Sequence, residues 1–77
     1  MYSSYVLIDV EPGMEKSVFS TISKLSLISD ANLLLGDHDI IVKIQAEDMR
    51  EIGIFVINSI RSIEGVSNTK TLACAVF

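Results

Sequence analysis

The stretch Gly36-Asp37-His38-Asp39 is a compact polar cluster between two strongly apolar runs. Two carboxylates and an imidazole can bind an ammonium group, exchange a proton or ligate a metal ion. The flanking runs, residues 31–35 and 40–44, are rich in strand formers, so the cluster is predicted to form the tip of a β-hairpin. Gly and Asp are also ordinary turn residues. The pattern therefore supports both a ligand site and a plain turn.

The size of the chain limits how it can be stabilised. It has 77 residues, one histidine and one cysteine, Cys74. This excludes an internal disulfide and a four-ligand zinc site of the usual kind. A single domain of this length buries only about 60% of its unfolded surface, yet 49% of the residues are hydrophobic. We therefore expect oligomerisation, with Cys74 as a small buried hydrophobic residue.

Charge and hydropathy argue against two classes of partner. The formal net charge is −4, and the basic residues do not cluster, which disfavours direct binding to nucleic acid. No apolar run approaches the roughly 18 residues that span a bilayer. The first residues lack the layout of a signal peptide. Together with the single cysteine, these features predict a cytoplasmic protein.

The first half of the chain predicts a strand, a helix and a hairpin. Residues 5–10 are strand formers and end at Glu11-Pro12-Gly13, where proline provides no backbone donor. A helical stripe follows at steps of four, four and three, formed by Met14, Val18, Ile22 and Leu25. Residues 26–30 are expected to be a connector, with hairpin strands at residues 31–35 and 39–45.

The second half predicts another helix and a final strand. Asp48 with Glu51 three residues later is typical of a capping box. Gly65 is expected to end the helix, and residues 66–77 form the last strand. Ile54 is predicted to point outward, with Phe55 and Ile57 flanking the buried stripe. That inward stripe is Met49, Ile52, Val56, Ile60 and Ile63.

The resulting order, β-α-β-β-α-β, predicts an α+β, ferredoxin-like fold. Right-handed crossovers place both helices on one face of a four-stranded antiparallel sheet, with the first and third strands in the centre. The other face receives no helix, although Leu7 and Ile41 would leave apolar surface there. We expect a second copy of the chain to cover it, sheet against sheet.

Three local patterns carry a resemblance to a known family. They are Glu11-Pro12-Gly13 after the first strand, Gly36-Asp37-His38-Asp39 in the hairpin, and Gly65-Val66 leading into Thr69-Lys70-Thr71. In this order and spacing, the chain resembles the effector-binding (RAM) domain of the Lrp/AsnC family of transcriptional regulators. The resemblance covers essentially the whole sequence.

The resemblance implies a non-catalytic domain that senses an amino acid and assembles, without metal or cofactor. It further implies dimers that associate into octamers or decamers, with the effector bound between dimers and full-length regulators as further partners. Because the first strand begins within five residues of Met1, we expect one domain over residues 1–77 and no DNA-binding domain.

The family's hairpin motif is Gly-x-Tyr-Asp, which Gly36 and Asp39 match, while His38 replaces the usual tyrosine. Thr69 and Thr71 match the threonines that follow the Gly-Val pair. Asp39 would accept the ammonium group of an amino acid, and backbone amides near Gly36 and a threonine hydroxyl would hold its carboxylate. The candidate ligand-binding residues are Gly36, Asp37, His38, Asp39, Thr69 and Thr71.

Other functions share this order of elements. An ACT-type amino-acid-binding domain would form dimers side by side. A small ferredoxin-like enzyme, such as a monooxygenase or an acylphosphatase, is less well supported because His38 lies on a turn and no Arg-Asn pair is placed for phosphate chemistry. A transition-metal site at Asp37-His38-Asp39 is disfavoured because adjacent turn side chains converge poorly.

Overall fold

A computed structural model describes residues 1–75 as a four-stranded antiparallel sheet with two helices. Strand order across the sheet is β2-β3-β1-β4. The predicted order of elements, with the first and third strands in the centre, is confirmed. The elements are β1 (Tyr2–Val10), α1 (Glu15–Ser23), β2 (Ile28–Leu33), β3 (Ile40–Ala46), α2 (Met49–Phe55), a π-helical turn η1 (Val56–Ile60) and β4 (Val66–Ala73).

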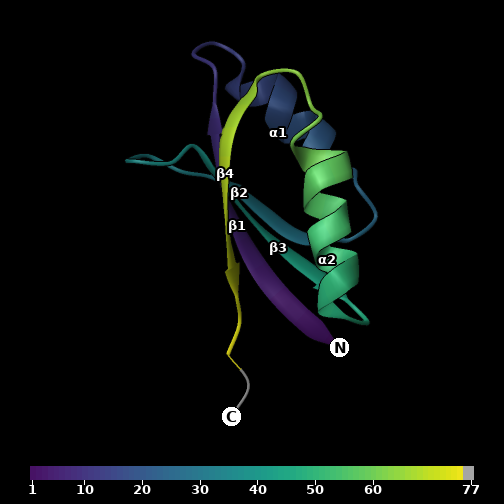
Figure 1. Cartoon of the computed structure of the whole chain (residues 1–77). Coiled ribbons are helices and arrows are strands. Elements are labelled where there is room, and N and C mark those ends of the chain that lie inside the picture. Colours follow the sequence, from purple (N-terminus) through teal and green to yellow (C-terminus); the bar gives the residue numbers. More distant parts are fainter. Residues whose placement is uncertain (76–77) are drawn as a thin grey trace.

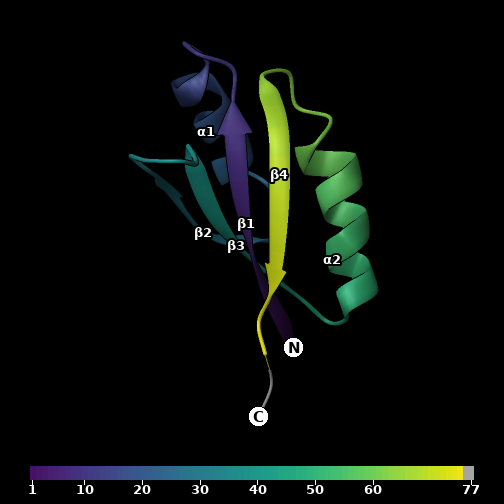
Figure 2. The same ribbon diagram turned by 60° about the vertical axis from the view of Figure 1, so that its left-hand side comes forward.

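Both helices lie on one side of the sheet, and the loop between β2 and β3 extends away from them (Figure 1). Figure 2 shows the sheet from its uncovered side, with β1 between β3 and β4 and the helices behind. No helix within residues 1–75 is long and apolar enough to cross a membrane.

The covered face, which is the helix side of the sheet, forms the core. Alternation along β1 and β3 places Val6 opposite Val42 and Ile8 opposite Ile40. These side chains pack with Val18 and Ile22 of α1 and with residues of the second helix. The fully buried apolar side chains are Val6, Ile8, Val18, Ile22, Ile40, Val42, Ile44, Ile52 and Ile60.

The opposite side, here called the open face, is covered by no layer within residues 1–75 of a single chain. It comprises the alternate residues of the central and β4 strands, including Tyr5, Leu7, Asp9, Ile41, Lys43, Asn68, Lys70 and Leu72. Leu7 pairs directly with Ile41. Tyr5 is 39% exposed and Leu72 is 45% exposed. This face therefore combines apolar side chains with charged ones.

The start of α2 follows the predicted capping chemistry. Asp48 Oδ1 accepts the Glu51 N–H at 2.8 Å, and Glu51 Oε1 accepts the Glu47 N–H at 3.3 Å. The buried stripe differs in two places: Met49 is 39% exposed, and Phe55 is buried instead of flanking the stripe. The buried residues of α2 are therefore Ile52 and Phe55, and its first turn is exposed.

The end of the second helix was not anticipated. Arg61 N–H donates to Val56 O at 2.9 Å, five residues back, which closes the π-helical turn η1. The helix ends there, so the prediction that Gly65 terminates it is wrong. Gly65 lies in the following loop with φ +102°, where an added Cβ would come within 2.9 Å of Val18 Cγ2. A close approach to α1 therefore requires glycine at this position.

Several strand boundaries differ from the predicted ones. β1 begins at Tyr2, three residues before the predicted start. β2 begins at Ile28, so part of the predicted connector belongs to this edge strand. Ile28 pairs with Ile44 and Asp30 pairs with Lys43, so Ser29 is an extra, bulged residue that breaks the alternation. β2 ends at Leu33 and β3 begins at Ile40, so the hairpin loop is longer than predicted at both of its ends.

The last strand is shorter than predicted within the described residues. β4 ends at Ala73, and the predicted continuation to Phe77 extends into residues 76–77, which lie outside the described part. Cys74 is exposed, so the prediction of a buried cysteine is wrong for the single chain. It lies beyond the end of β4, where no layer covers it, although its N–H still donates to Ser3 O at 3.0 Å.

Candidate functional site

The hairpin loop is attached to the end of β1 through its backbone. Asp39 N–H donates to Ile8 O at 3.0 Å, and Leu34 N–H donates to Asp39 O at 2.8 Å. Gly36 has φ +142°, a conformation that side chains rarely allow. Gly36 and Asp37 are both exposed at the tip. The predicted turn chemistry thus explains why this loop reverses at glycine.

The Asp39 carboxylate has a structural role. Its Oδ2 accepts the Val10 N–H at 2.8 Å, at the end of β1 and beside the bulge in β4. Its Oδ1 makes no hydrogen bond within residues 1–75. A carboxylate oxygen has two lone pairs, so Asp39 can hold the strand end and still accept a donor from a ligand.

His38 lies in the hairpin loop, and its side chain contacts another strand. Its Nδ1 lies 2.9 Å from Asp9 Oδ1, and the two side chains are 30% and 28% exposed. Asn68 of β4 donates weakly to Asp9 Oδ2 at 3.5 Å. Asp9 therefore connects the hairpin to β4 across the end of the sheet, a role that the sequence analysis missed. The available signal was a single charged residue in an otherwise apolar strand.

The two threonines lie on the other side of β4. Thr69 pairs with Ile8 and Thr71 pairs with Val6 in the register, so both are on the covered side, whereas Asn68 belongs to the open face. Thr69 is only 9% exposed, and Thr71 is exposed. No hydrogen bond within the described chain joins the hairpin residues to either threonine. One chain therefore presents the predicted residues as two separate groups.

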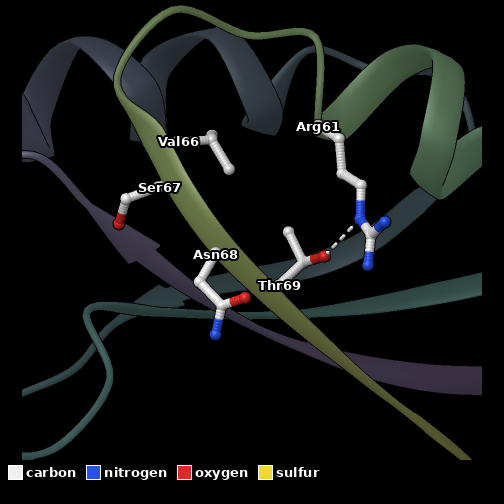
Figure 3. Close-up of a pocket in the computed structure, with 5 residues that line it drawn as sticks. All are labelled: Arg61, Val66, Ser67, Asn68 and Thr69. Atoms are coloured by element: carbon white, nitrogen blue, oxygen red, sulfur yellow. Dashed lines mark hydrogen bonds between the residues drawn. The ribbon is translucent and has the colours of Figure 1, made fainter.

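Thr69 is instead bound to an arginine that the sequence analysis did not select. Arg61 Nε–H donates to Thr69 Oγ1 at 2.8 Å, and Figure 3 shows the two side chains pointing toward each other. They border a pocket of about 270 Å³, lined by Arg61, Val66, Ser67, Asn68 and Thr69. The sequence offered little signal for it, because an arginine near a helix end is commonly a solvated residue.

A bulge in β4 shapes this pocket. Asp9 pairs with Asn68 while Val10 pairs with Val66, so Ser67 has no partner on β1. In Figure 3 the Ser67 side chain points away from Arg61. The extra residue shifts the alternation of β4 so that Val66 and Thr69 lie on the same side. Residues 1–75 contain no group of three or more His, Cys, Asp or Glu side chains that could hold a metal ion.

Comparison with known families decides the relationship. The Lrp/AsnC ligand binding domain matches residues 3–74. This chain belongs to that family. An HTH-type transcriptional regulator of Pyrococcus furiosus, itself uncharacterized, is 31% identical over 77 residues, which covers 96% of this chain and 51% of the relative. The chain spans about half the length of the curated relatives it matches, with coverage as low as 43%.

Solved structures confirm the ferredoxin-like arrangement. TTHA0845 from Thermus thermophilus aligns with a TM-score of 0.94 at 25% identity, covering 100% of this chain and 96% of that chain. The transcriptional regulator NMB0573 from Neisseria meningitidis, solved in complex with L-Met, aligns with a TM-score of 0.86 at 16% identity. That alignment covers 97% of this chain and 50% of the Neisseria protein. The family match over residues 3–74 confirms the resemblance to Lrp/AsnC domains, and the curated relatives are HTH-type transcriptional regulators.

Proposed function

We propose that this chain is a non-catalytic sensing and assembly domain, which binds a free amino acid between dimers and thereby modulates transcription regulators of its family. The proposal is carried by one observation. The polar residues of the candidate site form two separate groups on a sheet whose open face is not covered by residues 1–75 of the same chain. The L-Met complex of the Neisseria regulator, which shares the fold, supports an amino acid as the class of effector.

The open face supports a dimer that packs sheet against sheet. Its centre is the Leu7–Ile41 pair, and Tyr5 and Leu72 extend the apolar surface. Lys43 lies with its Nζ 5.9 Å from the centre of the Tyr5 ring, so a positive charge lies beside the apolar side chains. A second copy would remove these apolar side chains from water.

The ligand site would use groups of opposite character. Asp39 Oδ1 is available to accept an ammonium group, and the Thr69 and Thr71 hydroxyls would bind a carboxylate. In one chain these groups lie on different sides of the sheet edge. A ligand that contacts both groups would therefore take them from different copies, which is why we place it between dimers. Gly36, Asp37 and His38, at the exposed end of the hairpin, would complete the contact.

Calorimetry with the assembled protein tests this proposal. Light scattering first establishes the oligomer, and each of the twenty amino acids is then titrated at concentrations up to about 5 mM, a Kd range equivalent to roughly 3–4 kcal/mol of binding. We expect saturable binding of at least one amino acid and a loss of binding in Asp39→Asn. The matched control is Asp30→Asn, on the exposed part of β2.

Two results would contradict the proposal. One is a monodisperse monomer at micromolar concentration, which would remove the dimer and the site between dimers. The other is an intact oligomer that binds none of the twenty amino acids. A mixed assembly with a full-length Lrp/AsnC regulator, measured by co-purification of differently tagged chains, tests the proposed partner separately.

A further inference from the structure

Arg61 is held in place by a neutral group and not by a carboxylate. Its Nε–H donates to Thr69 Oγ1, and both Nη groups have no hydrogen-bond partner within residues 1–75. No Asp or Glu of the described chain forms an ion pair with it, although the sequence has ten carboxylates against six Lys and Arg. An oriented guanidinium without a counter-charge is therefore available to an external anion.

The surrounding pocket has the complementary character. Its lining contains one charged side chain, Arg61, and no acidic residue. Thr69 contributes a polar side chain and Val66 an apolar wall, whereas the Asn68 side chain lies on the open face, where it donates to Asp9 Oδ2. With about 270 Å³ of space, the pocket suits a small ion or one end of a small molecule. The lining offers no negative charge that would balance a cationic ligand.

Two backbone irregularities border the same pocket. The π-helical turn η1 ends at Ile60 and sets the direction in which Arg61 leaves the helix. On the facing strand, the bulge at Ser67 brings Thr69 to the side of Arg61. Both kinds of irregularity occur preferentially near functional sites, where they redirect a side chain. Here the π-helical turn and the bulge bring the guanidinium of Arg61 next to the hydroxyl of Thr69.

We infer that this pocket is an anion-binding site, in which the Nη groups of Arg61 bind a small oxyanion, either a carboxylate or a phosphate. A guanidinium binds either group through two parallel N–H donors, and these charge-assisted bonds are stronger than neutral ones. Thr69 positions the guanidinium. The inference shares Thr69 with the proposed function but does not rest on it, because the Nη groups of Arg61 would bind the oxyanion within a single chain, whichever amino acid the assembled domain binds.

Titration calorimetry tests the site with two probes, succinate and inorganic phosphate, at constant ionic strength maintained with chloride. Comparing the probes distinguishes the two sources of oxyanion. The test variant is Arg61→Gln, which removes the charge and the fork. Arg61→Lys keeps the charge but loses the fork. The matched control is Arg50→Gln, which removes one positive charge from α2, outside this pocket.

We expect saturable binding of at least one probe by the wild-type protein. Arg61→Gln should weaken it about tenfold or more, Arg61→Lys should weaken it less, and Arg50→Gln should leave it within about twofold. Thr69→Val, which removes the hydrogen bond to Nε, should weaken binding while the charge remains. Circular dichroism of every variant confirms that the fold is retained.

Three outcomes would overturn the inference: no saturable binding of either probe, equal binding by Arg61→Gln and wild type, or an equal loss in Arg50→Gln. The amino-acid screen on the same samples separates the two proposals. Succinate or phosphate binding that depends on Arg61, without binding of any amino acid, would leave this site intact and contradict the sensing role. Amino-acid binding without saturable binding of succinate or phosphate would support the sensing role and contradict this site.

Discussion

The two faces of one sheet differ in what completes them. Ile8 on the covered face is fully buried beneath the helices of its own chain, whereas its neighbour Leu7 on the open face remains partly exposed. Both are branched aliphatic residues of similar size in the same central strand. The difference shows that a single chain buries the apolar side chains of one face of its sheet and leaves those of the other face partly exposed to water. The covered face determines the fold, and the open face is available for association.

Ile8→Ala compared with Leu7→Ala gives the largest expected difference. Ile8→Ala should lower the free energy of unfolding by about 2–5 kcal/mol, because it leaves a cavity in a packed core. Leu7→Ala should cost under about 1 kcal/mol when association is suppressed by dilution, since its site is partly open. Urea denaturation at low protein concentration measures both. Equal losses at the two positions would end the distinction between the faces.

Asp39→Ala tests the contact between the hairpin loop and the end of β1. It leaves the Val10 N–H without its acceptor, which should cost about 1–3 kcal/mol. Asp37→Ala is the control, because Asp37 is exposed at the tip and should change stability by under about 0.5 kcal/mol. Thermal denaturation of both variants provides the measurement. Similar melting temperatures would show that the carboxylate of Asp39 does not stabilise the strand end.

Leu7→Glu tests association through the open face. A buried glutamate opposite Ile41 should weaken the dimer by at least about tenfold in Kd, or roughly 1.4 kcal/mol. Ser20→Glu adds the same charge at an exposed position of α1 and should leave the dimer unchanged. Sedimentation equilibrium measures both constants. If the Leu7 variant assembles as tightly as the Ser20 variant, the interface lies elsewhere.

Ser4→Ala gives the smallest effect and the opposite sign. Ser4 Oγ is buried on the covered face without a hydrogen-bond partner in the described chain, so its removal should stabilise the protein by about 1 kcal/mol. Ser3, one residue earlier on the open side, accepts a hydrogen bond from Gln45 Nε2 at 3.3 Å. Ser3→Ala should therefore be neutral or slightly destabilising. A destabilised Ser4→Ala variant would indicate that the hydroxyl has a partner.

Local chemistry in the sequence predicted the elements that depend on it. The stripe of Val18 and Ile22 predicted α1, Asp48 with Glu51 predicted the start of α2, and the strand pattern predicted that Leu7 lies on the face without a helix. These features repeat over one or two turns or pleats, so neighbouring residues determine them. Boundaries failed where one extra residue breaks a repeat, as at the Ser29 bulge, because the energy of a bulge depends on the partner strand.

The candidate site divided in the same way. Residue types alone identified Gly36 and Asp39 as turn residues that could also bind a ligand. They did not reveal that His38 contacts Asp9, 29 residues away. Arg61 was missed because its partner, Thr69, is reached only after the chain has passed through η1 and the following loop. Each of these contacts joins separate elements, so its existence depends on the register and bulges of the sheet.

The sequence by itself determined the order of strands and helices, the apolar stripe of each, and the presence of apolar residues on both sides of β1. The tertiary structure decided which polar side chains meet: the hairpin with Asp9, and Arg61 with Thr69. Hydrophobic periodicity is a local property that survives small errors in position. A hydrogen bond tolerates only a few tenths of an ångström, so it is set by the packing of the whole chain.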